Sequence, residues 1–257
     1  MERLSSLMPA NLKATVLSYD ELVKARSDAY NEMKGKLDGY DCPVCHNKGM
    51  ISDIRNGEEV FRNCTCMNIR ASLKRIQISG LSSHIENCTL DKFECKEGWQ
   101  THIKNQAQQY INNGGATWFT MLGQSGSGKT HICTAVTAAL MKQGRLAKYM
   151  QWSSESTELK SNVNEEEYQK HINVIKNIDV LYIDDLFKAN VTKADVKLAF
   201  DIINYRGINN LTTIISSELM TYELIAIDEA IAGRIIQMSG SYIMSLKKNQ
   251  SKNYRLK

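Results

Sequence analysis

The chain has 257 residues, of which 42% are hydrophobic and 23% are charged, and its formal net charge is +4. This size and composition fit one medium domain with a smaller part beside it, and the net charge is too small to indicate nucleic-acid binding by itself. No apolar run approaches the roughly 18 residues of a membrane span, and the start MERLSSLMPANLK lacks a secretion-signal layout. We therefore expect a cytoplasmic protein, bacterial or phage-encoded, without a membrane partner.

The first predicted element is an amphipathic helix over residues 10–38. Apolar residues recur there at spacings of three, four or seven, with charged residues between them, which is the pattern of a helix with one apolar stripe. They are Leu12, Val16, Tyr19, Val23, Tyr30, Met33 and Leu37. The stripe either packs on its own protein or docks a partner, and the pattern does not separate the two.

Four of the seven cysteines follow as two close pairs, CPVC and CTC, separated by a polar stretch with hairpin character around RNGEEV. Two short pairs on facing turns can supply the four soft ligands that zinc prefers at tetrahedral corners. We therefore expect a structural zinc site, because four protein ligands leave no position open for chemistry. His46 is adjacent and could replace one sulfur. The ligands are predicted to be Cys42, Cys45, Cys64 and Cys66.

From about residue 80 onward, apolar strands alternate with helical segments. The predicted strands are 116–122, 146–152, 178–185, 211–217 and 241–246. The predicted helices are one that follows the first strand and is closed by Gly144, and segments near 155–177, 193–206 and 221–238. This alternation predicts an α/β fold with a five-stranded parallel sheet between helices, and ligands at the carboxyl ends of the strands.

The motif GQSGSGKTHI begins at such a carboxyl end. Two glycines four residues apart, followed by Lys and Thr, form a loop whose backbone N–H groups cradle phosphates, with Lys129 on the outer phosphates and Thr130 on Mg²⁺. The expected cofactors are ATP and Mg²⁺. We expect nucleotide contacts from Gly123, Ser125, Gly126, Ser127, Gly128, Lys129, Thr130 and His131.

A second motif, VLYIDD, places two acids at the tip of a buried strand. Asp184 is predicted to hold the magnesium through water, and Asp185 to polarise the attacking water. The alternative interpretation of paired acids after a strand is a solvated turn. With the phosphate loop on the same chain, we expect the catalytic arrangement.

Several motifs in order, SGLSSHIENCTLDKF, GQSGSGKTH, VLYIDDL, TTIISSE, IDEAIAGRI and NYRL, resemble the DnaC/DnaI-type replicative helicase loaders. These are AAA+ ATPases of the IstB/DnaC-like branch, close to the initiator DnaA, and the resemblance covers roughly residues 79–257. The cysteine module is similar to the zinc-containing helicase-binding domain of the DnaI-like members. The resemblance implies a helicase-binding part over 1–78 and an AAA+ ATPase domain over 79–257.

The resemblance also implies roles for three further positions. Arg234 matches the arginine that reaches into a neighbouring subunit's ATP, so the isolated chain should hydrolyse ATP slowly. Ser217 matches the polar residue that senses the terminal phosphate, although Ser216 or Glu218 could hold that role. Arg255 matches a second sensing arginine, or is only a tail charge.

The segment 153–178 lies where relatives carry a helical element that faces single-stranded DNA. It holds basic residues, Lys160, Lys170, His171 and Lys176, but also three consecutive glutamates, Glu165, Glu166 and Glu167. A helix of mixed sign is either a solvated face or a DNA contact, and DNA binding there should weaken with salt.

Together these motifs imply an ATP-dependent loader. It would bind a hexameric DnaB-type replicative helicase, assemble with its neighbours through the ATP sites, and deliver the helicase to single-stranded DNA during replication initiation. One alternative is an IstB-like transposition helper ATPase. Another is an ATP-gated protein that binds the helicase without loading it, since folds and nucleotide sites are shared by unrelated activities.

Overall fold

The computed structural model describes residues 18–78, 87–161, 164–188, 190–247, 249 and 253, with the side chains of 75–78 left out. Its contacts divide the chain into two compact units, Met1–Cys64 and Thr65–Lys257. The functional division predicted between residues 78 and 79 stays a prediction. No helix of the described residues combines the length and apolar character that a membrane span requires.

The described residues of the first unit form one helix and one hairpin. Helix α1 (Tyr19–Glu32) begins with a capping box between Ser18 and Glu21, which satisfies free N–H groups of its first turn. Strands β1 (Met50–Arg55) and β2 (Glu58–Asn63) pair antiparallel. The two residues between them, Asn56 and Gly57, both have positive φ, as a tight two-residue hairpin turn requires. The hairpin predicted around RNGEEV is therefore confirmed.

The predicted helix over 10–38 is wrong at its carboxyl end, and residues 10–17 lie outside the described residues. After Glu32 the chain becomes extended at Met33. The N–H of Gly35 then donates to the carbonyl of His46 at 2.6 Å. A Cβ on Gly35 would lie 2.1 Å from the carbonyl oxygen of Asn47, so only glycine permits this approach. Backbone hydrogen bonds to the cysteine loop thus take the place of the hydrogen bonds that would continue the helix.

The second unit is built on one parallel sheet with the strand order β4-β5-β6-β3-β7. The strands are β3 (Phe119–Gly123), β4 (Ala147–Gln151), β5 (Val180–Asp184), β6 (Thr212–Ser217) and β7 (Ile243–Leu246). Four of them lie inside the predicted segments, and β3 overlaps its segment and ends one residue beyond it, at Gly123. The predicted α/β fold with a five-stranded parallel sheet is confirmed, and β3, β5 and β6 end side by side at one edge.

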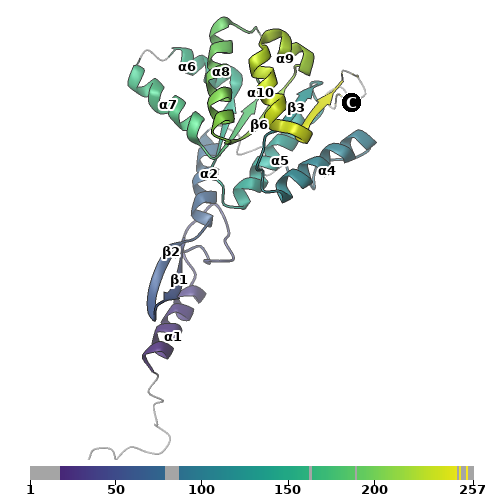
Figure 1. Ribbon diagram of the computed structural model, residues 1–257. Helices are drawn as coiled ribbons and strands as arrows, with labels where there is room; N and C mark the ends of the chain where they lie inside the picture. Colours follow the sequence, from purple (N-terminus) through teal and green to yellow (C-terminus); the bar gives the residue numbers. More distant parts are fainter. Residues whose placement is uncertain are drawn as a thin grey trace, which may run out of the picture. The chain divides into compact units, whose positions relative to one another are not determined.

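Helices cover both faces of this sheet (Figure 1), and an apolar core lies on each face. Alternate residues of a strand contribute to opposite cores; for example, Phe119 and Met121 belong to one, and Trp118 and Leu122 to the other. The helices of the first face are α4 (Gly98–Asn112) and α5 (Lys129–Lys142), with α2 (Cys66–Ile78) against α5 and β4. The other face is covered by α6 (Trp152–Ser161), α7 (Glu165–Asn177), α8 (Lys193–Ile208), α9 (Thr221–Ile227) and α10 (Glu229–Ser239), and the 3-10 turn η2 (Gly240–Tyr242) leads into β7.

Two predicted helices are in fact helix pairs. The segment near 155–177 contains α6 and α7, and Asn164 caps α7 by accepting from the N–H groups of Glu166 and Glu167. The segment near 221–238 contains α9 and α10, because Asp228 adopts an extended conformation and caps α10 by accepting from the N–H of Ile231 at 2.8 Å. Side chains that bond to the backbone stop one helix and start the next.

A buried arginine, Arg206, forms hydrogen bonds both to the end of α7 and to strand β6 of the sheet. The Arg206 guanidinium is fully buried and donates to the carbonyls of Ile175, Lys176 and Ile178 at the end of α7. It also donates to the carbonyl of Thr212 on β6 at 2.6 Å. Burial lowers the pKa of Arg206 to about 9, so the group remains charged at neutral pH and complements the negative end of the helix dipole.

Candidate functional site

The phosphate loop connects the end of β3 to the start of α5, as predicted. Gly123, Gly126 and Gly128 have positive φ, which allows the loop to turn its N–H groups inward. A Cβ on Gly123 would lie 2.2 Å from the carbonyl oxygen of Leu246 on β7, so this position requires glycine for space as well. The loop is therefore shaped by backbone conformation and close packing together.

The ammonium of Lys129 lies inside this loop. Its Nζ donates to the carbonyls of Gly123 and Gln124, each at 2.8 Å, and the residue is 5% exposed. Burial lowers the pKa of Lys129, while the negative charges of Glu218 and Asp185 oppose that shift. A cation held here by two neutral carbonyls is available to bind the outer phosphates of a nucleotide.

Asp184 is held by a network of hydroxyl groups. Its carboxylate accepts hydrogen bonds from Tyr149 at 3.0 Å, from Tyr182 at 2.6 Å and from Ser216. Thr130, the predicted magnesium ligand, donates to the same carboxylate at 3.3 Å. A hydroxyl and a carboxylate side by side form the donor set that Mg²⁺ uses in nucleotide sites. The residues present therefore fit the metal predicted here.

The motifs gave no role to the two tyrosines that donate to Asp184. Tyr149 and Tyr182 face each other in register on β4 and β5. Burial raises the pKa of both phenols, and the neighbouring charge of Asp184 adds to the effect. Tyrosine at these strand positions would be assigned to the core, and only the sheet order brings both hydroxyls to one carboxylate.

Asp185 lies beside two further charged groups. Its carboxylate forms an ion pair with Lys188 at 2.6 Å, and Lys188 is also 3.5 Å from the Glu218 carboxylate. The hydrogen bond that Lys188 donates to Asp185, together with the negative charge of that carboxylate, raises the pKa of Lys188 against the opposing effect of burial. Burial would raise the pKa of Glu218, but the hydrogen bond from Ser125 and the charge of Lys188 outweigh it, so that pKa is lowered.

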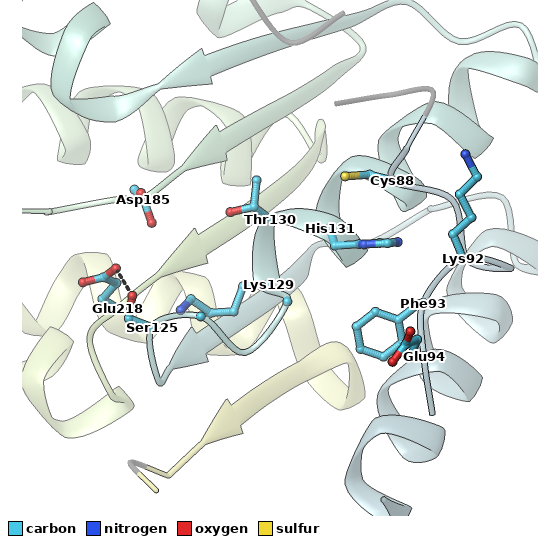
Figure 2. A pocket seen from close by; sticks show the side chains of 12 residues that line it. Cys88, Lys92, Phe93, Glu94, Ser125, Lys129, Thr130, His131, Asp185 and Glu218 are labelled. Carbon is cyan, nitrogen blue, oxygen red and sulfur yellow. Dashed lines mark hydrogen bonds between the residues drawn. The ribbon is translucent and has the colours of Figure 1, made fainter. Parts of the chain in front are cut away.

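Some of these groups line a cavity of about 500 Å³ (Figure 2). Lys129, Thr130, Asp185 and Glu218 lie on the phosphate side, where Ser125 Oγ donates to Glu218 at 2.9 Å. A cavity of this volume with a few convergent polar groups is the form of a small-ligand site. The cavity can hold a nucleotide.

The opposite wall comes from a segment that the motifs did not assign to the site. Cys88, Lys92, Phe93 and Glu94 line it. The Phe93 ring lies so close to Gly128 that a Cβ there would be 2.8 Å from it, and it packs edge-on against the His131 ring at 5.5 Å. The aromatic ring in this wall offers an apolar surface against which the base of a nucleotide can pack.

His131 has a different setting from the rest of the loop. Its Nε2 bonds the carbonyl of Thr89 at 2.8 Å, and its ring contacts Phe93. Predicted as a nucleotide contact, it lies in the cavity lining and also positions the opposite wall.

The three candidates for the phosphate sensor, Ser216, Ser217 and Glu218, have different surroundings. Ser217 is fully buried, and its hydroxyl donates to the carbonyl of Leu186 at 2.7 Å. Ser216 is also fully buried, but it bonds Asp184 and accepts from the Asp185 N–H at 2.9 Å. Glu218 alone of the three lines the cavity.

Neither predicted arginine is found in this cavity: Arg234 lies apart from it, and Arg255 is not among the described residues. Arg234 on α10 is half-buried, and it donates to Asn204 on α8 and to Gln237, each at 3.2 Å. It is absent from the cavity lining, as a residue offered to a neighbouring subunit would be. Arg255 lies outside the described residues.

The basic residues of segment 153–178 are paired with acids. Lys170 pairs with Glu166 within α7, and His171 bonds Glu155 of α6 at 2.7 Å. The remaining pairs are Lys160 with Asp195 and Lys176 with Asp201. These ion pairs favour the solvated-face interpretation of this segment over a DNA contact.

The four predicted zinc ligands lie together and are buried. Their sulfur atoms lie within 4.8 Å of one another. The distance from Cys42 Sγ to Cys64 Sγ is 3.8 Å, and the Zn–S bond of about 2.3 Å implies a tetrahedral edge of roughly that length. The Gly49 N–H also donates to Cys45 Sγ at 3.3 Å, which favours a thiolate. The donor set thus fits zinc, and His46 is not a member of the cluster.

Comparisons with known proteins agree with this geometry. Residues 70–240 match the sequence profile of the IstB-like ATP binding proteins. The chain is 29% identical over 245 residues to the phage-like element PBSX protein XkdC of Bacillus subtilis, with 89% of this chain and 91% of that protein covered. It is 21% identical over 214 residues to the replicative helicase loader DnaC of Escherichia coli, with 80% and 76% covered.

A crystal structure of the DnaC helicase loader has the same fold. It aligns with a TM-score of 0.53 and 22% identity over 64% of this chain and 98% of that chain. The AAA+ fold expected from the motifs is therefore confirmed.

Proposed function

The chain belongs to the family of IstB-like ATP binding proteins, and from this premise we propose that it is an ATP-dependent loader of a hexameric replicative helicase. ATP with Mg²⁺ occupies the cavity between the phosphate loop and the Phe93 wall. Slow hydrolysis then switches the protein between two states of affinity for its partners, and the loaded helicase is left on single-stranded DNA.

The observation that carries the loader function is the exposed apolar surface of the zinc-binding unit. Tyr19 and Met33 are each 61% exposed and Val44 is 60% exposed. Leu22 on α1 and Phe61 on β2 are also exposed. A small unit that leaves these side chains in water, on a chain that also carries a nucleotide switch, suits an ATPase that binds another protein. The similarity to a replicative helicase loader over 80% of the chain supports the identity of that partner.

The residues of the site divide the proposed work. Lys129 binds the outer phosphates, Thr130 and Asp184 hold the metal, and Asp185 polarises the attacking water. Arg234 completes the site of a neighbouring subunit, so hydrolysis is coupled to assembly. Zinc supplies folding energy for a cysteine module that has little core of its own.

The proposal is tested by capture and by loading. The tagged full chain, with ATP and Mg²⁺, should retain a replicative helicase from the cytoplasm that contains it, and Lys129→Ala should retain much less. On a template whose single-stranded part is coated with binding protein, purified helicase should then unwind the adjoining duplex faster when the chain and ATP are added. Retention without any gain in unwinding would instead identify an antagonist that occupies the helicase.

A second candidate is a transposition helper ATPase. The family match to IstB-like proteins and the similarity to a phage-element protein favour it. Such a protein would bind a transposase and duplex DNA. Retention of a transposase in the capture experiment, with the helicase absent, would support this candidate and contradict the loader.

A further inference from the structure

The ion pair between Lys188 and Asp185 has no part in the function proposed so far. Lys188 Nζ lies 2.6 Å from Asp185 Oδ2 and 3.5 Å from Glu218 Oε1. Glu218 in turn accepts from Ser125 in the phosphate loop (Figure 2). Lys188 therefore links the acid that would polarise water to the acid beside the phosphate loop.

The backbone holds Lys188 in this place through a tight turn. Asp185 and Phe187 have φ of 55° and 59°, in the left-handed region that residues with a Cβ seldom adopt. Such a turn persists only where its surroundings hold it. The Phe187 side chain is 2% exposed and packs edge-on against Trp152 at 5.5 Å. The Lys188 N–H donates back to the Asp185 carbonyl at 3.0 Å.

Two lysines, Lys129 and Lys188, lie near the acids, and only Lys188 can exchange its partners readily. Lys129 is buried and bonded to two carbonyls of the loop. The Lys188 side chain is 41% exposed, and its pair with Asp185 is open to water and to competing charges. A partly exposed ion pair is weak enough to open in water, and it is strong enough to change the rate of hydrolysis by a small factor.

We propose that Lys188 is a positioning residue that restrains Asp185 and keeps hydrolysis by the isolated chain slow. An oxygen of Asp185 that binds the ammonium is not free to orient the attacking water. This inference rests on the proposed ATP hydrolysis at the same cavity.

The test compares steady-state hydrolysis of Mg-ATP by the full chain without partners. Lys188→Met should raise kcat about two- to fivefold, the range that a partly exposed ion pair can supply, at an unchanged KM. Lys188→Arg keeps the charge and should stay near the wild-type rate. Lys193→Met, an exposed lysine at the start of α8 outside the cavity lining, is the matched control and should change neither parameter.

A double variant shows whether the effect passes through Asp185. The gain in kcat of Lys188→Met should disappear when Asp185→Asn is added. A fall or no change in kcat for Lys188→Met would overturn the inference, and so would a raised KM, which would mean that Lys188 binds the phosphates. If neither wild type nor Lys188→Met hydrolyses ATP, the proposed ATPase activity is itself wrong and the inference with it.

Discussion

Two buried serines, Ser216 and Ser217, lie at the end of β6, and replacing Ser216 by Ala distinguishes its role from that of Ser217. The Ser216 hydroxyl donates to Asp184 and accepts from the Asp185 N–H at 2.9 Å, so it couples both acids. Its loss removes one hydrogen bond to a charged group, worth about 1.5–3 kcal/mol, and one neutral bond, worth about 0.5–1.5 kcal/mol. We expect the variant to be less stable by roughly 2–4 kcal/mol, which lowers Tm by about 5–15 °C in a unit of this size.

The matched control is Ser217→Ala. Ser217 is equally buried, and its hydroxyl bonds the Leu186 carbonyl and the Leu219 N–H. Its loss should cost about 1–3 kcal/mol of folding stability through two neutral bonds. Stability alone therefore separates the two variants poorly, and the decisive measurement is the binding of ATP.

The assay is titration of a fluorescent ATP analogue at a temperature where both variants are folded, with Mg²⁺ and with a chelator. Ser216→Ala should weaken binding in Mg²⁺ by roughly tenfold, because the bond that orients Asp184 is lost. Binding in the chelator should change little. Ser217→Ala should stay within about twofold in both conditions. A larger loss for Ser217→Ala, or normal Mg²⁺-dependent binding by Ser216→Ala, would refute this assignment.

Three other predictions concern the metal, the phosphates and the neighbouring subunit. Elemental analysis should find about one zinc per chain, lost in Cys45→Ser and kept in Cys95→Ser, an exposed cysteine outside the cluster; a chain that folds without metal would contradict this. Lys129→Ala should lose ATP binding by at least about tenfold in the same titration, since a charge-assisted bond is worth about 1.5–3 kcal/mol, and unchanged affinity would disprove its placement. Arg234→Ala should bind ATP normally yet lose the extra hydrolysis induced by partners, and full stimulation would exclude its role in a neighbouring site.

Local patterns predicted the parts of this site that are close in sequence. The glycine loop, Lys129 and Thr130 follow a strand and open a helix, so their backbone placement is dictated within ten residues. The two cysteine pairs and the hairpin between them were predictable for the same reason. The helix over 10–38 was predicted too long because its apolar spacing continues past Glu32, whereas Gly35 and Leu37 bond the cysteine loop instead.

Other parts depended on contacts between distant residues. The Phe93 wall was missed because nothing in the segment around it marks a nucleotide site until it lies against Gly128 and His131. The pairing of the basic residues in 153–178 with acids was also unpredictable, because Lys160 and Lys176 find their partners on α8.

The sequence by itself determined the alternating α/β fold, the phosphate loop, the acidic pair and the four-cysteine cluster, since each follows from a periodicity or a short spacing. Only the tertiary structure decided that Tyr149, Tyr182 and Ser216 converge on Asp184. It also decided that, of the three sensor candidates, Glu218 lines the cavity, and that Lys188 reaches Asp185 through a left-handed turn. The physical reason is that parallel strands separated by long connections become neighbours only through the order of the sheet.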